Sequence, residues 1–248
     1  MGGFGNYAFQ TYLDETEIET GFYDYDSKSS IFTLRALRKV YKKNYVGLGY
    51  YYNKAHTVFK ELPSESTLTS NSLQLIYLHN SRNNVYFPTK GIKASFQYTV
   101  YPKWMNETES FGLFNAYINA YVPTKRNNVW VFRANSKFGT KELEFQKQVV
   151  LGGVDLRGYA DGKYRGTGKF DVQTEFRYQL PKRFGLIGFT GLATIYGSDI
   201  EEFNWKLYPT VGLGVRYTAV KSTNMRFGVD VARGKDDWAF YFRIGESF

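Results

Sequence analysis

The sequence has 248 residues, enough for one domain or two small ones with a buried core. It contains no cysteine, which excludes a disulfide scaffold and every site built on thiolate ligands. Aromatic residues make up 19% of the chain, although its mean hydropathy is −0.43. No uncharged stretch reaches the ~18 apolar residues of a membrane helix, and disordered chains are poor in aromatic residues. These limits leave an all-β protein and favour a membrane barrel over a soluble sandwich.

Apolar and polar residues alternate with a period of two along almost the whole chain, which is the pattern of half-buried strands. In chain order, the pattern predicts strands at 17–25, 30–40, 44–58, 69–80, 91–102, 109–122, 127–139, 169–181, 184–197, 206–219, 223–233 and 236–248. Residues 1–16 are either an N-terminal extension or an extra strand. We therefore expect an all-β, antiparallel up-and-down transmembrane barrel over residues 17–248 with about 12 strands, with 14 or 16 as alternatives.

The connections alternate in length, as in membrane barrels with short turns at one end and longer loops at the other. The inward faces collect charged residues, which suits a solvated interior, an anion-favouring channel or a lattice that grips an inserted loop. These residues are Arg35, Lys93, Arg133, Lys137, Arg177, Arg216, Arg226, Arg243, Asp171, Glu175 and Asp230. The formal net charge of +9 selects no partner by itself. No basic arm is present, and we expect no nucleic-acid partner.

The longest connection, at about 141–168, carries the Gly-rich run LGGVDLRGYADGKYRG. Loops of this length in a compact domain are usually functional or disordered. Within the run, Leu156-Arg157-Gly158-Tyr159 resembles the signature loop of the BamA, TamA and FhaC superfamily of outer-membrane barrels. The resemblance implies that this loop folds back into the lumen, where its arginine pairs with acidic groups on the barrel wall.

Three further features are similar to this family. Arg82-Asn83-Asn84, followed by Phe87-Pro88-Thr89-Lys90-Gly91, resembles its periplasmic turn, with Arg82, Pro88 and Gly91 as the matching residues. Five predicted strands follow the signature loop. The end of the chain resembles the family's final strand and sorting signal, with Phe240, Phe242 and Phe248 as its aromatic residues.

One departure concerns the partner of Arg157. The family's F-x-G-x-D-x-G strand meets Phe189-Thr190-Gly191-Leu192-Ala193 here, so Ala193 stands in place of the aspartate. An arginine withdrawn from water needs a carboxylate. We therefore expect Glu175, or less favourably Asp171, to pair with Arg157.

The resemblance implies a short member of the family without POTRA domains, in the outer membrane of a Gram-negative bacterium. Its implied role is to assist polypeptide insertion or translocation, with an unfolded polypeptide as client. Lipids, lipopolysaccharide and the barrel-assembly machinery are the other implied partners. A passive pore, a membrane anchor or the barrel domain of a patatin-like autotransporter is the alternative.

Catalytic and metal-binding patterns are missing from the sequence. The two histidines, His56 and His79, fall near opposite ends of one predicted hairpin, and no H-E-x-x-H, G-x-S-x-G or P-loop motif occurs. We expect no enzyme activity, no cofactor and no metal. An outer-membrane hydrolase and a soluble nucleic-acid binder are the disfavoured readings.

Overall fold

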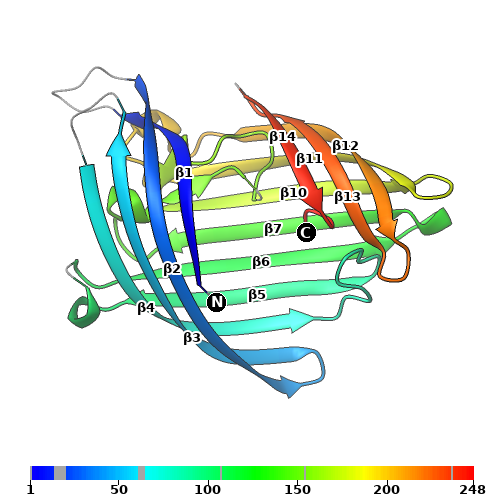
Figure 1. The fold of residues 1–248 in the computed structure, drawn as a ribbon, viewed down its shortest axis with the longest axis horizontal. Coiled ribbons are helices and arrows are strands. Elements are labelled where there is room, and N and C mark those ends of the chain that lie inside the picture. Colours follow the sequence, from blue (N-terminus) through cyan, green and yellow to red (C-terminus); the bar gives the residue numbers. More distant parts are fainter. Residues whose placement is uncertain (1, 14–20, 61–64, 107, 154, 236) are drawn as a thin grey trace.

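The computed structural model describes residues 2–13, 21–60, 65–106, 108–153, 155–235 and 237–248, and for residues 2–13, 21, 22 and 146 it describes the backbone alone. Twelve antiparallel strands form one sheet in the order β1-β2-β3-β4-β5-β6-β7-β10-β11-β12-β13-β14 (Figure 1). The strands are β1 (Gly2–Leu13), β2 (Gly21–Tyr41), β3 (Asn44–Phe59), β4 (Glu65–Asn80), β5 (Gly91–Tyr101), β6 (Phe111–Pro123), β7 (Val129–Gly139), β10 (Gly168–Gln179), β11 (Phe184–Tyr196), β12 (Tyr208–Val220), β13 (Met225–Arg233) and β14 (Trp238–Ile244).

The remaining elements are short and lie in the connections. A separate hairpin of β8 (Val149–Leu151) and β9 (Tyr164–Gly166) lies in the connection between β7 and β10. Single 3-10 turns are η1 (Lys103–Met105), η2 (Lys125–Asn127), η3 (Phe145–Lys147) and η4 (Glu201–Phe203). Among the described residues, no helix is long and apolar enough to cross a membrane.

The sheet curls into an up-and-down barrel that is open along one line. Each strand pairs with its neighbours in the chain, but the described parts of β1 and β14 form no ladder with each other. The first and last strands therefore each have one edge that is not paired within the sheet, which leaves a seam between them.

The N-terminal part of the expected strand order is wrong. The predicted strands 17–25 and 30–40 are one strand, β2, because the polar run between them continues the ladder. Lys28, for example, pairs with His56 of β3 and with Asn6 of β1, so no turn is needed there. The extra strand that completes the sheet is β1, which lies within residues 1–16, whereas residues 14–20 lie outside the described chain.

The two faces of the sheet differ in the way that the alternation predicts. Large apolar side chains lie exposed on the outer face, such as Leu213 (72%) and Phe240 (68%), whereas buried polar and charged side chains crowd the interior. Exposed aromatic residues lie near both ends of the strands: Tyr41, Tyr77, Tyr178 and Tyr217 at one end, and Trp104, Trp205 and Trp238 at the other.

The connections define two ends of the barrel. We call the end with residues 42–43, 81–90, 124–128, 180–183 and 221–224 the turn end. The opposite end, with the described residues 60, 102–106, 108–110, 140–153, 155–167, 197–207, 234–235 and 237, is the loop end. The β4–β5 connection is the one long segment at the turn end, and it carries the Arg82–Gly91 motif.

The end of the chain does not follow the predicted strand 236–248. β14 stops at Ile244, and Gly245 takes a φ of +90°, a left-handed conformation that favours glycine. The last residues, which we call the tail (residues 245–248), turn away from the strand. Phe248 is 9% exposed and packs in the interior with Phe87, Tyr121, Val129 and Val131.

Candidate functional site

The candidate site is the barrel interior, where the β7–β10 loop and the tail meet the wall. The β8–β9 hairpin carries the loop tip, which lies between its two strands in the sequence. The tip residues Leu156 and Tyr159 are 1% exposed, so the tip is buried in the interior. They belong to one apolar cluster with Leu151, Tyr164, Ala193, Ile195, Ile200, Phe203 and Tyr208. The Tyr159 hydroxyl donates to the carbonyl of Pro209 at 2.6 Å. The loop is therefore packed against β11 and β12 as part of the core.

Gly158 makes the close approach of the loop tip possible. Its φ is +99°, and a Cβ there would lie 2.8 Å from Thr210 Oγ1 and 2.9 Å from the backbone of Arg233. Its amide donates to the hydroxyl of Tyr241 on β14 at 2.9 Å. A larger residue would push the tip, and Arg157 with it, away from the wall.

Arg157 is 0% exposed and lies between two carboxylates. Its Nη2 is 2.8 Å from Glu175 Oε2 on β10, and its Nη1 is 3.2 Å from Asp230 Oδ2 on β13. The guanidinium carbon stands 3.4 Å from the ring centroid of Phe189, a cation–π contact, and Nη1 also donates to Ser247 Oγ at 3.0 Å. Residues of three strands and of the tail thus contact the buried guanidinium of the loop.

The two carboxylates that were predicted from the sequence as partners of Arg157 lie in different surroundings. Glu175 contacts it, whereas Asp171 instead accepts a hydrogen bond from Asn135 at 2.7 Å. The second partner, Asp230, was expected to face inward but was not identified as a partner of the loop. Ala193 packs against the loop tip, and the acidic group that the family places on this strand is supplied from β13.

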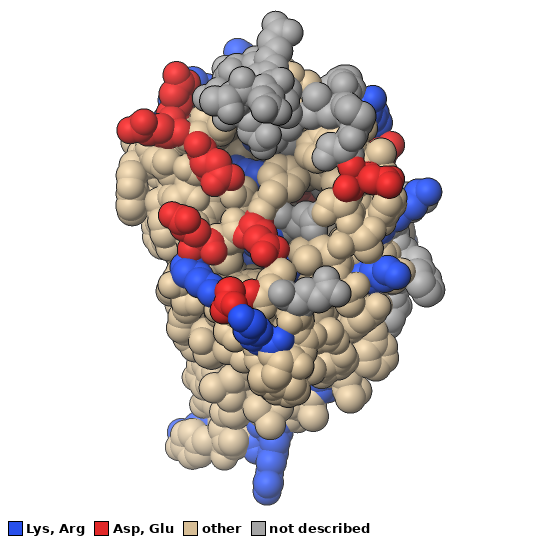
Figure 2. All heavy atoms as spheres, turned by 90° about the vertical axis from the view of Figure 1, so that its left-hand side faces the viewer, with Lys and Arg blue, Asp and Glu red and all other residues tan. Residues whose placement is uncertain are grey.

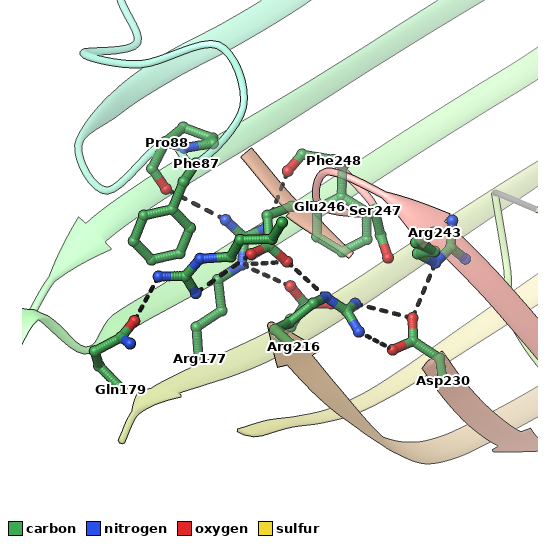
Figure 3. A network of polar contacts seen from close by, with 12 residues as sticks. Phe87, Pro88, Arg177, Gln179, Arg216, Asp230, Arg243, Glu246, Ser247 and Phe248 are labelled. Carbon is green, nitrogen blue, oxygen red and sulfur yellow. Dashed lines mark hydrogen bonds and ion pairs between the residues drawn. The ribbon is translucent and has the colours of Figure 1, made fainter. Parts of the chain in front are cut away.

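The tail completes the ion network, as Figure 3 shows. Glu246 lies 3.1 Å from Arg216 Nε, 3.6 Å from Arg226 Nη1 and 4.0 Å from Arg177 Nε. Arg177 Nη2 also donates to the carbonyl of Phe248 at 3.0 Å. The tail is therefore bound through its side chains and its backbone to β10, β12 and β13.

The network contains more cations than carboxylates. Glu175 pairs with Arg177 at 2.7 Å, and Asp230 pairs with Arg216 and, at 2.9 Å, with Arg243. The five arginines are Arg157, Arg177, Arg216, Arg226 and Arg243, and the three side-chain carboxylates are Glu175, Asp230 and Glu246. Each carboxylate is thus shared by two or three arginines.

Separate ion pairs hold the residue next to the loop tip. Asp155 lies 2.7 Å from Lys169 Nζ and 2.9 Å from Arg133 Nη2. Burial alone would raise the pKa of Asp155, but Lys169 and Arg133 hold it below its usual value. On the opposite wall, Lys147 donates to Ser70 Oγ, and burial lowers the pKa of Lys147 to about 8.

The β4–β5 connection closes the interior at the turn end. Asn83, which replaces the aspartate of the family's motif, accepts hydrogen bonds from the amides of Thr89 and Lys90 at 3.0 and 3.1 Å. Arg82 donates to Asn80, and Gly91 begins β5. The carbonyl of Pro88 accepts a hydrogen bond from Arg177 at 3.3 Å, which joins this connection to the network.

The aromatic residues of the C-terminal motif lie on both sides of the sheet. Phe240 and Phe242 are 68% and 87% exposed on the outer face of β14, whereas Phe248 is inside. The guanidinium carbons of Arg157 and Arg133 each lie 5.5 Å from the centroid of the Phe248 ring. The terminal phenylalanine thus contacts the loop instead of extending the strand.

The part of the chain that the structure describes shows no arrangement of side chains typical of a catalytic or metal site. His56 pairs with Thr67 and His79 with Asn44, at opposite ends of the β3–β4 ladder. No group of three His, Asp or Glu side chains among the described residues could hold a metal ion. The site can bind, hold or release chain segments by charge and packing.

Comparison with known proteins agrees with this architecture. The model of the Omp85 superfamily domain matches residues 5–248. A structure of BamA from Haemophilus ducreyi lacking POTRA domains 1–3 is similar, with a TM-score of 0.66, 15% identity, and coverage of 90% of this chain and 53% of that chain. CdiB from Acinetobacter baumannii is similar with a TM-score of 0.64, 14% identity, and coverage of 98% and 46%. The chain thus spans about half the length of both proteins.

Proposed function

The chain belongs to the Omp85 superfamily, and from this premise we propose that it assists the insertion or translocation of polypeptides at the outer membrane of a Gram-negative bacterium. The observation that carries the proposal is the seam between β1 and β14. A strand edge with unpaired N–H and C=O groups is a template for another strand. A client segment entering as a strand would find that template at β14.

The outer surface supports the membrane location. Its exposed apolar side chains lie between aromatic residues at the two strand ends, as expected of a surface in contact with lipid. Membrane lipids, and lipopolysaccharide on one side, are therefore the proposed surroundings. The barrel-assembly machinery is the proposed partner during biogenesis.

A membrane anchor is the second candidate, and the filled interior favours it over a passive pore. The loop tip and the tail pack into the interior with buried side chains around Arg157, which a passive pore does not require. An anchor needs neither a pore nor an active seam. Neither candidate requires hydrolytic chemistry.

Cysteine crosslinking to a client separates these candidates, because the chain has no cysteine of its own. A client barrel with one cysteine in its last strand would be added, in denaturant, to vesicles that contain the Phe240→Cys variant. The matched control is Leu213→Cys on β12, which is similarly exposed on the same face but lies on a strand paired on both sides.

The proposal predicts a disulfide between the client and Phe240→Cys, with little at Leu213→Cys, and faster client folding than in empty vesicles. Equal crosslinking at both positions would indicate random collision. Unchanged client folding would favour the anchor.

A further inference from the structure

The two ends of the barrel differ in charge. The five turn-end segments contain nine Lys and Arg and no Asp or Glu: Lys42, Lys43, Arg82, Lys90, Lys125, Arg126, Lys182, Arg183 and Lys221. Their charge equals the formal net charge of the whole chain, +9, so the remaining residues sum to zero. A charge of one sign concentrated on one surface attracts an oppositely charged partner before contact.

The loop end carries both signs. Its described residues, within 60, 102–106, 108–110, 140–153, 155–167, 197–207, 234–235 and 237, contain nine Asp and Glu and nine Lys and Arg. Figure 2 looks onto this end, where acidic and basic side chains lie among one another. The turn end is therefore selectively basic, which the composition of the whole chain does not show.

A polar cavity of about 560 Å³ opens at the turn end, between the β4–β5, β6–β7, β10–β11 and β12–β13 connections. Its lining includes the amides of Asn127 and Asn224 and the cations Lys182, Lys221 and Arg226, and none of its described lining residues is acidic. Amide side chains both donate and accept hydrogen bonds, as a peptide backbone requires of its partner.

Arg226 is a buried residue of this lining, and one of its hydrogen-bond donors is unused among the described residues. It is 5% exposed, its guanidinium lies 3.5 Å from the ring centroid of Phe87, and Gln179 accepts a hydrogen bond from its Nη2. Its one nearby carboxylate, Glu246, is 3.6 Å away and is shared with Arg216 and Arg177. The Arg226 Nε has no hydrogen-bond partner among the described residues.

We propose that the turn end is a docking surface for an acidic polypeptide segment, with one carboxylate of the segment entering the cavity toward Arg226. Connections from strands far apart in the sheet surround the cavity, whereas lipid would contact the outer face. The cavity amides suit a backbone, and the seven cations of the four surrounding connections suit further acidic side chains. This inference goes beyond the proposed function, because docking requires neither insertion nor translocation of a client.

The test is the binding of a fluorescent peptide of alternating Glu and Ser to the full chain in discs of zwitterionic lipid, measured by fluorescence anisotropy. The Lys182→Glu/Lys221→Glu variant reverses two cavity cations. The matched control, Lys206→Glu/Lys235→Glu, makes the same charge change on exposed lysines of the loop end. A peptide in which Gln replaces Glu controls for charge.

The proposal predicts that the cavity variant binds the acidic peptide at least about tenfold more weakly, while the control variant stays close to the unmodified chain. Binding should also fall as salt rises, because exposed charges are screened beyond about 8 Å at physiological ionic strength. Equal loss in both variants, or equal binding of the Gln peptide, would overturn the proposal. So would a surface that ignores the peptide but binds anionic phospholipid vesicles through the same two lysines, since it would then be a lipid site.

Discussion

Replacing Asp230 by asparagine should destabilise the barrel more than removing Arg157. Asp230 is 0% exposed and pairs with Arg157, Arg216 and Arg243, so Asp230→Asn leaves two fully buried arginines and the partly buried Arg243 with less compensation. Breaking one buried pair typically costs about 3–5 kcal/mol. We expect Asp230→Asn at the upper end of that range, because the network already contains five arginines and three side-chain carboxylates.

Arg157→Ala removes one cation and therefore reduces the excess of arginines over carboxylates. After the loss of Arg157, Glu175 keeps Arg177, and Asp230 keeps Arg216 and Arg243. Neither carboxylate is left alone, so we expect a loss of about 2–3 kcal/mol, from packing, the contact with Phe189 and the loop's own anchoring.

The assay is the denaturant midpoint of the folded band on a gel, measured in detergent and converted with a common slope. Asp171→Asn is the matched control, because Asp171 is equally buried but bonds to Asn135 and contacts none of the five arginines. We expect that control to cost no more than about 1–2 kcal/mol. A larger loss for Arg157→Ala than for Asp230→Asn would refute the reasoning from charge imbalance.

The pair of Arg157 and Glu175 can be tested by a double-mutant cycle. Arg157→Ala and Glu175→Gln each remove the 2.8 Å contact, so the double variant should lose less than the sum of the two. We expect a coupling of about 1–3 kcal/mol in magnitude. Additive losses would mean that Asp230 and Phe189 hold the loop without Glu175.

Three further outcomes are expected. The protein should require detergent and migrate faster unheated than boiled, because its outer face is apolar; a monodisperse detergent-free protein would contradict this. Conductance in planar bilayers should be small, and deletion of residues 154–163 should enlarge it; unchanged conductance would place the loop outside the interior. Because burial lowers the pKa of Lys147 to about 8 from its ordinary 10.5, the folded state favours the neutral amine, and stability should rise between these pH values. Lys147→Met should remove that rise, and an identical pH profile in the variant would contradict it.

The strand pattern could be predicted because a period of two separates an apolar outer face from a charged interior. The strands between residues 44 and 233 appear close to their expected bounds. The expected count of twelve strands is also found, because β1 replaces the strand that was lost when 17–25 and 30–40 proved to be one. There the run Asp26–Ser30 is polar on both faces, and alternation cannot distinguish a turn from a strand in such a segment. Pairing with β1 on one side and β3 on the other keeps it extended.

The partners of Arg157 could be predicted only in part. Glu175 was a candidate because it faces inward on the strand that follows the loop. Asp230 also faces inward, but it lies 73 residues from Arg157. Which of several inward carboxylates meets the loop depends on sheet curvature and register, and the sequence shows neither.

The tail contributes to the balance of charge in the interior. Arg177, Arg216 and Arg226 are all buried, but Glu175 and Asp230, which pair with Arg177 and Arg216, are both shared with Arg157. A third carboxylate for these arginines must therefore come from another segment. Glu246 supplies it only because the chain turns inward at Gly245, and the same turn brings Ser247 to Arg157. A strand extended to Phe248 would leave these arginines without that charge. The loop and the last four residues, about 90 residues apart in sequence, therefore act as a single stabilising unit.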